Sequence, residues 1–250
     1  MEMAMATVPV VIEQVLGRSC QGVTQPFICV GDDGETYYVK GAGAGRRSLV
    51  SEWTAGHLAT AFGLPVPPFV LAEVPPALVA LKVRPDLADL GAGLVFASRK
   101  LAHAQELTSI TRARVPVETA RDVLVFDWWV RNQDRILTDY GGNPNLLWDM
   151  EADALAVIDH NQAFDWEFDP RRFMELHVFA EQWNSVFGDF DARGAYVQRL
   201  ESLLTSLPTL RASIPEAWWW VADDVPAQVS WDAITDSLER CRRADFWNLP

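Results

Sequence analysis

Residues 126–165 read FDWWVRNQDRILTDYGGNPNLLWDMEADALAVIDHNQAFD, and the predicted fold is organised around them. The residues that lead into this stretch, PVETARDVLVFDWWV (116–130), predict a helix with Pro116 in its first turn. The polar run RNQDRILTDYGGNP is typical of a loop because it is rich in Gly, Asn and Asp. Asn145–Trp148 and Leu155–Asp159 then predict two short strands that are joined by a turn at DMEADA.

The predicted hairpin has a consequence for metal binding. A turn centred on residue 152 places Asn145 directly opposite Asp159. Residues that face each other in this way have Cβ atoms roughly 4.5–5.5 Å apart. An amide oxygen and a carboxylate at that separation can share one magnesium ion, which keeps waters and substrate phosphates as its other ligands. Asn143 is the alternative amide ligand, although Asn145 has the apolar Leu-Leu-Trp run behind it.

A third polar residue, Asp134, lies in the loop before the hairpin, where it can meet the hydroxyl group of a nucleophile. The order of an Asp, an Asn before an apolar strand and an Asp closing the next strand is that of the protein-kinase catalytic loop and its magnesium-binding Asp. Asn145 follows Asp134 by eleven residues, which is a longer spacing than in that pattern. An insertion such as ILTDYGG could absorb the difference. A polar loop beside an ordinary hairpin is the alternative interpretation of these residues alone.

The N-terminal part of the chain predicts three strands, VPVVIEQVL (8–16), TQPFICV (24–30) and ETYYVK (35–40). The loop GRSCQG (17–22) separates the first two strands. Its residues Gly17, Ser19 and Gly22 could allow backbone N–H groups to approach a phosphate, although a plain hairpin loop is the favoured interpretation of these residues alone.

Lys40 ends the third predicted strand, and Glu52 lies in the first turns of the following helix. A Lys on a strand that pairs with a Glu on the next helix is the kinase arrangement for holding nucleotide phosphates. A surface Lys and a surface Glu are the alternative. GAGAG (41–45) between these elements does not match a dinucleotide or phosphate-loop pattern, and we expect a flexible link there.

The remaining segments predict an α+β protein in which strands come first and helices follow. GLPVPPFVLAEV (63–74) and GLVFASRKL (93–101) predict strands, whereas AHAQELTSITRARV predicts a boundary between two lobes. Helices are predicted at 171–183, 192–207 and 233–247, and Trp218, Trp219 and Trp220 are expected in the core. We therefore expect a β-rich lobe over residues 1–101 and a mainly helical lobe over residues 102–250.

Composition limits the function. The chain has 250 residues and a formal net charge of −13 with a pI near 4.7, which argues against direct binding of nucleic acid. It lacks the run of about 18 apolar residues that a membrane span needs. The N-terminus lacks the basic residues of a signal peptide. Three cysteines without metal-binding spacing favour a reducing cytoplasm.

Five separated blocks of this sequence occur in the order found in HipA-like kinase domains, and the chain resembles that family over about residues 8 to 185. The blocks include YYVKG, VFASRKL, FDWWVRNQDR, GGNPNLLWD and VIDHNQAF. The resemblance implies a two-lobed protein-kinase-like fold that binds ATP and magnesium. Members of the toxin type phosphorylate Ser or Thr of translation proteins, and a small DNA-binding partner often restrains them.

The resemblance also implies roles for individual residues. Lys40 would contact the α- and β-phosphates, Asp134 would be the catalytic base, and Asn145 and Asp159 would hold magnesium. Asn132 and Arg135 would brace the catalytic loop, and the end of VFASRKL, from Ala97 to Leu101, would meet adenine. Ser19 would be a site of autophosphorylation, which in this family ejects the Gly-containing loop.

The sequence departs from typical protein kinases in two respects. Its metal motif reads Asp-His-Asn instead of Asp-Phe-Gly, and it has no Ala-Pro-Glu segment. A kinase for a small molecule or a lipid headgroup, and a pseudokinase that binds nucleotide or a partner without turnover, are therefore the competing functions.

Overall fold

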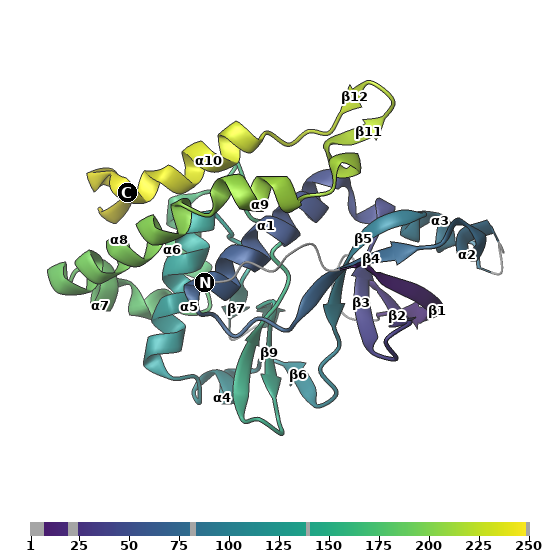
Figure 1. Cartoon of the computed structure of the whole chain (residues 1–250). Coiled ribbons are helices and arrows are strands. Elements are labelled where there is room, and N and C mark those ends of the chain that lie inside the picture. The colour runs from purple at the N-terminus through teal and green to yellow at the C-terminus, as the bar shows by residue number, and fades with distance from the viewer. Residues whose placement is uncertain (1–7, 20–24, 81–83, 139–140, 249–250) are drawn as a thin grey trace. The chain divides into compact units, whose positions relative to one another are not determined.

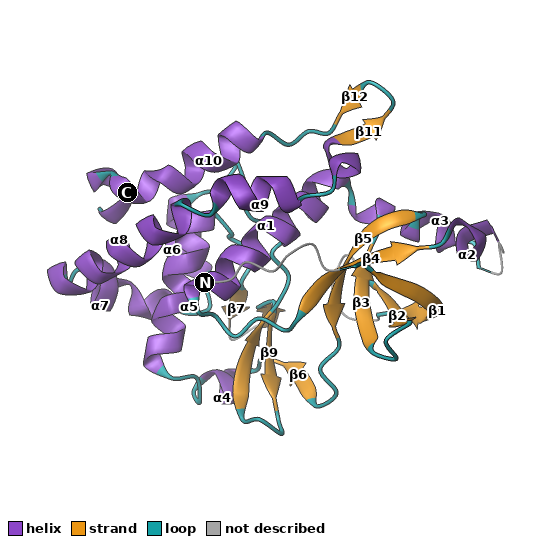
Figure 2. Cartoon of the chain, in the orientation of Figure 1, coloured by secondary structure: helices purple, strands orange, loops and turns teal. Residues whose placement is uncertain are grey.

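The computed structural model describes residues 8–19, 25–80, 84–138 and 141–248. The chain divides into two compact units. The first contains Met1–Val50, Pro67–Ala102 and Ser213–Val229, and the second contains Ser51–Val66, His103–Ala212 and Ser230–Pro250. Strands predominate in the first unit and helices in the second (Figure 2). The mixed α and β content predicted from the sequence is confirmed.

The first unit is built on a closed barrel of five strands in the order β1-β2-β3-β5-β4. The barrel closes because β1 pairs with β4 in parallel, whereas its other neighbouring strands are antiparallel. The unit contains β1 (Val10–Arg18), β2 (Phe27–Gly31), β3 (Thr36–Lys40), η1 (Ala42–Ala44), β4 (Phe69–Val74), α2 (Pro76–Ala80), α3 (Leu87–Leu90), β5 (Gly93–Arg99), η3 (Glu216–Trp219), β11 (Trp220–Ala222) and β12 (Val225–Pro226). The strands predicted at the N-terminus are confirmed in the described residues.

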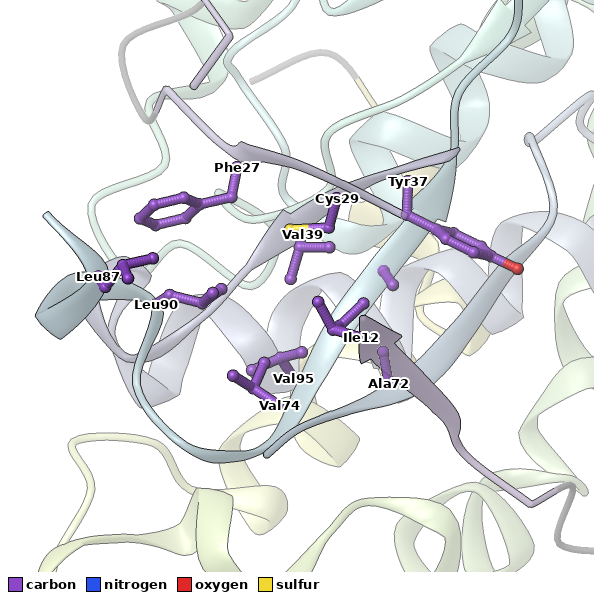
Figure 3. Close-up of a cluster of buried hydrophobic side chains, with 11 residues drawn as sticks. Ile12, Phe27, Cys29, Tyr37, Val39, Ala72, Val74, Leu87, Leu90 and Val95 are labelled. Atoms are coloured by element: carbon purple, nitrogen blue, oxygen red, sulfur yellow. The ribbon is translucent and has the colours of Figure 1, made fainter. Parts of the chain in front are cut away.

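Alternating apolar side chains of these strands fill the barrel (Figure 3). Phe27, Cys29, Tyr37 and Val39 point inwards from β2 and β3, because every second residue of a strand faces the same side. Leu87 and Leu90 of α3 belong to the same cluster. Burial raises the pKa of Cys29 to about 12, so this thiol acts as a small apolar core residue.

Residues 41–45, where the sequence predicted a flexible link, instead contain one turn of 3-10 helix, η1, that packs against α3. A Cβ atom on Gly41 would lie 2.0 Å from the carbonyl oxygen of Leu90, and one on Gly43 would lie 2.9 Å from the Cβ of Asp89. Glycine is therefore required here because two backbones approach closely.

The second unit is mainly helical and carries two small antiparallel sheets, β10-β9-β6 and β7-β8 (Figure 1). Helix α1 (Arg46–Phe62) contributes its residues from Ser51 onwards. The other elements are β6 (Ala104–Glu106), α4 (Ser109–Arg112), α5 (Val117–Val130), β7 (Ile136–Thr138), β8 (Gly141–Asn143), β9 (Leu146–Asp149), β10 (Ala154–Val157), α6 (Pro170–Leu176), η2 (Ala180–Gln182), α7 (Trp183–Phe187), α8 (Phe190–Leu204), α9 (Leu207–Ser213), α10 (Trp231–Glu239), η4 (Arg240–Arg242) and η5 (Ala244–Trp247). Among the described residues no helix combines the length and the apolar character needed to cross a membrane.

Two predictions for the C-terminal half are wrong. The helix predicted over 171–183 ends at Leu176, because His177 forms a β-bridge with Ile136 and the next residue donates its N–H to the carbonyl of Arg135 at 2.9 Å. The three consecutive tryptophans do not all lie in the core. Trp218 is buried and its indole N–H donates to the carbonyl of Leu94 at 2.9 Å, whereas Trp220 is 42% exposed.

Candidate active site

The catalytic loop expected from the sequence begins where α5 ends. Arg131 caps this helix in the left-handed conformation with φ of 53°, and the N–H of Asn132 donates to the carbonyl of Asp127 at 2.9 Å. Asn132 and Arg135 are fully buried. The loop is therefore anchored by two of its own polar side chains, Asn132 and Arg135, which are buried in the interior of the unit.

Asp127, which the sequence analysis did not single out, is the centre of this support. Its carboxylate accepts a hydrogen bond from Asn132 Nδ2 at 3.1 Å and forms an ion pair with Arg135 Nε at 2.8 Å. Because Asp127 stands in the apolar run VLVFDWWV of a buried helix, its charge was the signal that a polar partner lies nearby.

His177 is the third partner of Asp127, with Nε2 at 3.2 Å from Oδ2. The Nδ1 atom of His177 accepts the N–H of Phe179 at 3.1 Å, so the ring proton lies on Nε2 and is donated to the carboxylate. Burial lowers the pKa of His177, which keeps the ring neutral. The cluster thus contains one buried negative charge and one buried positive charge.

Asn132 and Arg135 connect Asp127 to the predicted site residues. Asn132 Oδ1 accepts the N–H of Asp134 at 3.3 Å. Arg135 Nη1 donates to the carbonyls of Asn145 and Ile158 at 2.5 and 2.8 Å. These two carbonyls lie at the open end of the β9–β10 hairpin, one before β9 and one after β10.

Asn145 and Asp134 lie in contact although they are eleven positions apart in the sequence. The Nδ2 atom of Asn145 donates to the carboxylate of Asp134 at 2.9 Å and to its backbone carbonyl at 3.0 Å. The intervening residues fold into the β7–β8 hairpin, in which Ile136 pairs with Asn143. Because the two strands of this hairpin are antiparallel, its ends lie close together, and the hairpin accommodates the long spacing between Asp134 and Asn145.

The register predicted for the metal hairpin is wrong by one residue. Leu146 pairs with Val157, and the N–H of Ile158 donates to the carbonyl of Asn145 at 3.2 Å, so Ile158, not Asp159, lies opposite Asn145. The cause is the turn. Asp149 Oδ1 accepts the N–H groups of Glu151 and Ala152, which closes a tighter turn than the one expected.

The one-residue shift in register does not by itself place the side chains of Asn145 and Asp159 on opposite faces of the hairpin. Asn145 and Asp159 lie outside the strands and have φ of 50° and 57°, in the left-handed region. The alternation of strand side chains therefore does not determine where these two side chains point. The convergence of their oxygens on one ion stays a prediction.

The segment that follows Asp159 is hydrogen-bonded to side chains of helix α1. The N–H of His160 donates to Glu52 Oε1 at 3.2 Å, and Ser51 Oγ donates to the carbonyl of Ala163 at 3.2 Å. Glu52 is 3% exposed. The alternative interpretation, in which Glu52 is an ordinary surface residue, is therefore wrong. The ion pair between Glu52 and Lys40 stays a prediction.

Lys40 lies at the end of β3 in the first unit and is also buried. A cavity of about 50 Å³ is lined by its side chain, Arg18, Asp89, Gly41 and other residues of that unit. Arg18 forms ion pairs with Asp86 at 3.0 Å and with Asp89 at 2.5 Å, so its charge is balanced within the unit. The cavity volume does not hold a nucleotide, and the phosphate-binding role of Lys40 stays a prediction.

The other predicted nucleotide-binding residues also belong to the first unit. Gly17 pairs with Ile28 across β1 and β2, and the N–H of the buried Ser19 donates to the carbonyl of Pro26 at 2.9 Å. Gly22 lies outside the described residues. Ala97 lies inside the barrel between Val39 and Val70, and Leu101 follows the end of β5.

The donor set of the second unit suits magnesium better than a softer metal. In the described part of the chain no three His, Cys, Asp or Glu side chains gather as a metal site. A carboxylate and an amide oxygen, from Asp159 and Asn145, are hard ligands that leave positions for waters and phosphates. The types of these two side chains therefore suit magnesium, whereas their convergence on one ion stays a prediction.

Comparison with known proteins shows the family of the chain. A family model described as HipA-like kinase matches residues 12–250. Among solved structures, the crystal structure of a Helicobacter pylori proinflammatory kinase CtkA is similar over 94% of this chain and 92% of that chain, with 14% sequence identity and a TM-score of 0.46. None of the curated proteins compared matches the chain.

Proposed function

The chain belongs to the HipA-like kinase family, and on that premise we propose that it uses ATP and magnesium to phosphorylate Ser or Thr hydroxyl groups of a protein. The observation that carries the proposal is the hydrogen bond between Asn145 Nδ2 and the Asp134 carboxylate. It brings a base-type side chain and an amide ligand together at the open end of the hairpin that leads into Asp159.

In this proposal each residue of the second unit has a chemical role. When bound, magnesium–ATP supplies the phosphoryl group and neutralises its charge. Asp134 accepts the proton of the incoming hydroxyl group, and Asn145 and Asp159 offer oxygen ligands to the metal. The amide proton donors of Asn145 are directed at Asp134, which leaves Oδ1 as the part of that amide for the metal. This orientation supports Asn145 over Asn143 as the ligand.

The residues of the first unit are assigned to the nucleotide. Lys40 binds phosphate oxygens, the loop from Gly17 to Gly22 approaches the same phosphates, and the chain from Ala97 to Leu101 meets adenine. The burial of Lys40 at a cavity of the first unit supports this assignment. We assign the predicted two-lobed kinase arrangement, residues 1–101 and 102–250, from the family of the chain.

We place this reaction in the cytoplasm. The described cysteines, Cys29 and Cys241, are free and buried, which suits a reducing compartment. A toxin role with a small antitoxin-like partner follows from the family resemblance alone and stays a prediction.

Purified protein, magnesium and radiolabelled ATP, incubated with and without proteins of a cell lysate, test the proposal. We expect label on protein Ser or Thr, dependent on magnesium and absent with Asp134→Asn. Label in a soluble small molecule would instead indicate a small-molecule or lipid-headgroup kinase. Nucleotide binding without any transfer of label would indicate a pseudokinase and overturn the proposal.

A further inference from the structure

Arg135 contacts the backbone of two segments outside its own loop. Its side chain is fully buried, and Nη1 lies within hydrogen-bond distance of two carbonyls on separate segments, those of Asn145 and Ile158. The Ile158 carbonyl belongs to the peptide group that leads into Asp159. One guanidinium thus holds the peptide groups next to both candidate metal ligands.

These two positions need external support. Asn145 and Asp159 both have positive φ, a backbone conformation that is unfavourable for L-residues, although Asn and Asp tolerate it better than most. Such conformations persist where surrounding contacts over-determine them. Arg135 supplies contacts of this kind at the open end of the hairpin, where the ladder of β9 and β10 has ended.

Arg135 is itself held by Asp127. The ion pair at 2.8 Å has no solvent exposure on either side chain, and it acts through charge, because Arg135 Nε makes no hydrogen bond of suitable geometry in the described structure. His177 and Asn132 donate hydrogen bonds to the same carboxylate. A buried guanidinium without its carboxylate would be strongly unfavourable, so the buried position of Arg135 depends on Asp127.

We propose that Asp127 and Arg135 form a positioning pair for the metal site, in which Asp127 holds Arg135 in its buried position and Arg135 sets the backbone of Asn145 and Asp159. Neither residue touches the ion in this proposal. The inference rests on the proposed function, because it requires that these two residues bind a metal. It extends that function by placing control of metal affinity in a buried pair behind the site.

Binding of Mn²⁺ with a non-hydrolysable ATP analogue, measured by electron paramagnetic resonance, tests the inference without recourse to turnover. Arg135→Lys keeps the charge but lacks the planar fork of donors. We expect its Mn²⁺ affinity to fall about tenfold to a hundredfold. Affinity for the analogue in EDTA, measured by calorimetry, should stay within about twofold of the parent, because Lys40 and the barrel do not depend on this pair.

Arg199→Lys is the matched control. Arg199 also pairs with an aspartate, Asp122, and donates to a backbone carbonyl, that of Phe62, at 2.8 and 2.6 Å, but its hydrogen bonds and ion pairs within the described residues do not reach the hairpin. We expect this variant to lose thermal stability and to retain Mn²⁺ affinity. Asp127→Glu, which keeps the charge that balances Arg135 but displaces the carboxylate by one methylene group, takes the place of Arg135→Lys if the latter does not fold.

The failures of the two proposals are distinguishable. Parent protein that binds the analogue but gives no bound Mn²⁺ overturns the proposed function, and the inference with it. Parent protein that binds Mn²⁺ while the variants bind it equally well, or lose metal and metal-free nucleotide affinity to the same degree, overturns the positioning role alone.

Discussion

The amide nitrogen of Asn145 donates hydrogen bonds to both the carboxylate and the backbone carbonyl of Asp134, at 2.9 and 3.0 Å. The proposed base and the proposed metal ligand are therefore one hydrogen-bonded unit. An alteration of either residue therefore alters the surroundings of the other.

Asp134→Asn is the substitution that separates catalysis from support. The new amide oxygen can still accept from Asn145, so we expect the melting temperature and ATP affinity to stay near those of the parent protein. Loss of the base should lower turnover by about two to four orders of magnitude. Turnover, calorimetric ATP binding and thermal melting measure these quantities. Full turnover, or an unfolded variant, would show that Asp134 is structural.

Asn145→Gly and Asn143→Gly decide between the two candidate amide ligands. Glycine tolerates the φ of 50° at position 145, so this substitution removes the amide without adding strain. We expect Asn145→Gly to raise the magnesium concentration for half-maximal turnover about tenfold or more. Asn143→Gly should leave that concentration unchanged, and the reverse pattern would assign the ligand to Asn143.

Lys40→Met tests the nucleotide site of the first unit. Methionine has a similar length and suits a buried position, so thermal stability should fall little or even rise. Affinity for ATP should fall about tenfold or more, because a charge-assisted contact with phosphate is lost. Equilibrium binding of a fluorescent ATP analogue provides the measurement, and an unchanged affinity would remove Lys40 from the site.

Gly41→Ala tests the close packing of η1 against α3. An added methyl group would lie 2.0 Å from the Leu90 carbonyl oxygen, so we expect a loss of about 2 kcal/mol or more in the free energy of unfolding. Gly194→Ala is the control, because it lies in helix α8 and a Cβ there meets no atom within 4 Å. It should stabilise the protein by up to about 1 kcal/mol. Equal effects in urea unfolding would contradict the packing argument.

His57 makes stability dependent on pH. Burial lowers the pKa of His57 to about 4, and its ring packs edge-on against Trp53. Because the unfolded chain binds the proton with an ordinary pKa near 6.5, this contribution is fully present above that pH and is lost as the pH falls towards 4. It amounts to about 2 kcal/mol between pH 7.5 and pH 5.0.

Urea unfolding at those two pH values measures the His57 effect. His57→Gln should reduce the difference in unfolding free energy between them by about that amount. His103→Gln, at a side chain that is 62% exposed, serves as the control. If the unfolding free energy changed between the two pH values by the same amount in the parent and in His57→Gln, the pH dependence would not come from His57.

Several elements were predictable because their residues follow a local period. The alternation in β2 and β3 predicts strands with one buried face, and Leu49, Trp53, Leu58 and Phe62 predict the buried face of α1. The helix predicted across His177 failed for the opposite reason. Its local pattern is helical, but backbone bonds to the loop around Arg135 end the helix, and such bonds between distant segments leave no periodic signal.

For the candidate site, the sequence by itself determined the types and the order of the polar groups. Asp134 lies in a loop, Asn145 precedes the first strand of a hairpin, and Asp159 follows its second strand. Only the tertiary structure decided how they are held. A side chain of the hairpin itself, that of Asp149, shifts the register by one residue, and the buried Asp127–Arg135 pair holds the open end. The physical reason is that left-handed conformations and buried charges are tolerable only with particular partners, and folding alone brings those partners from distant positions into contact.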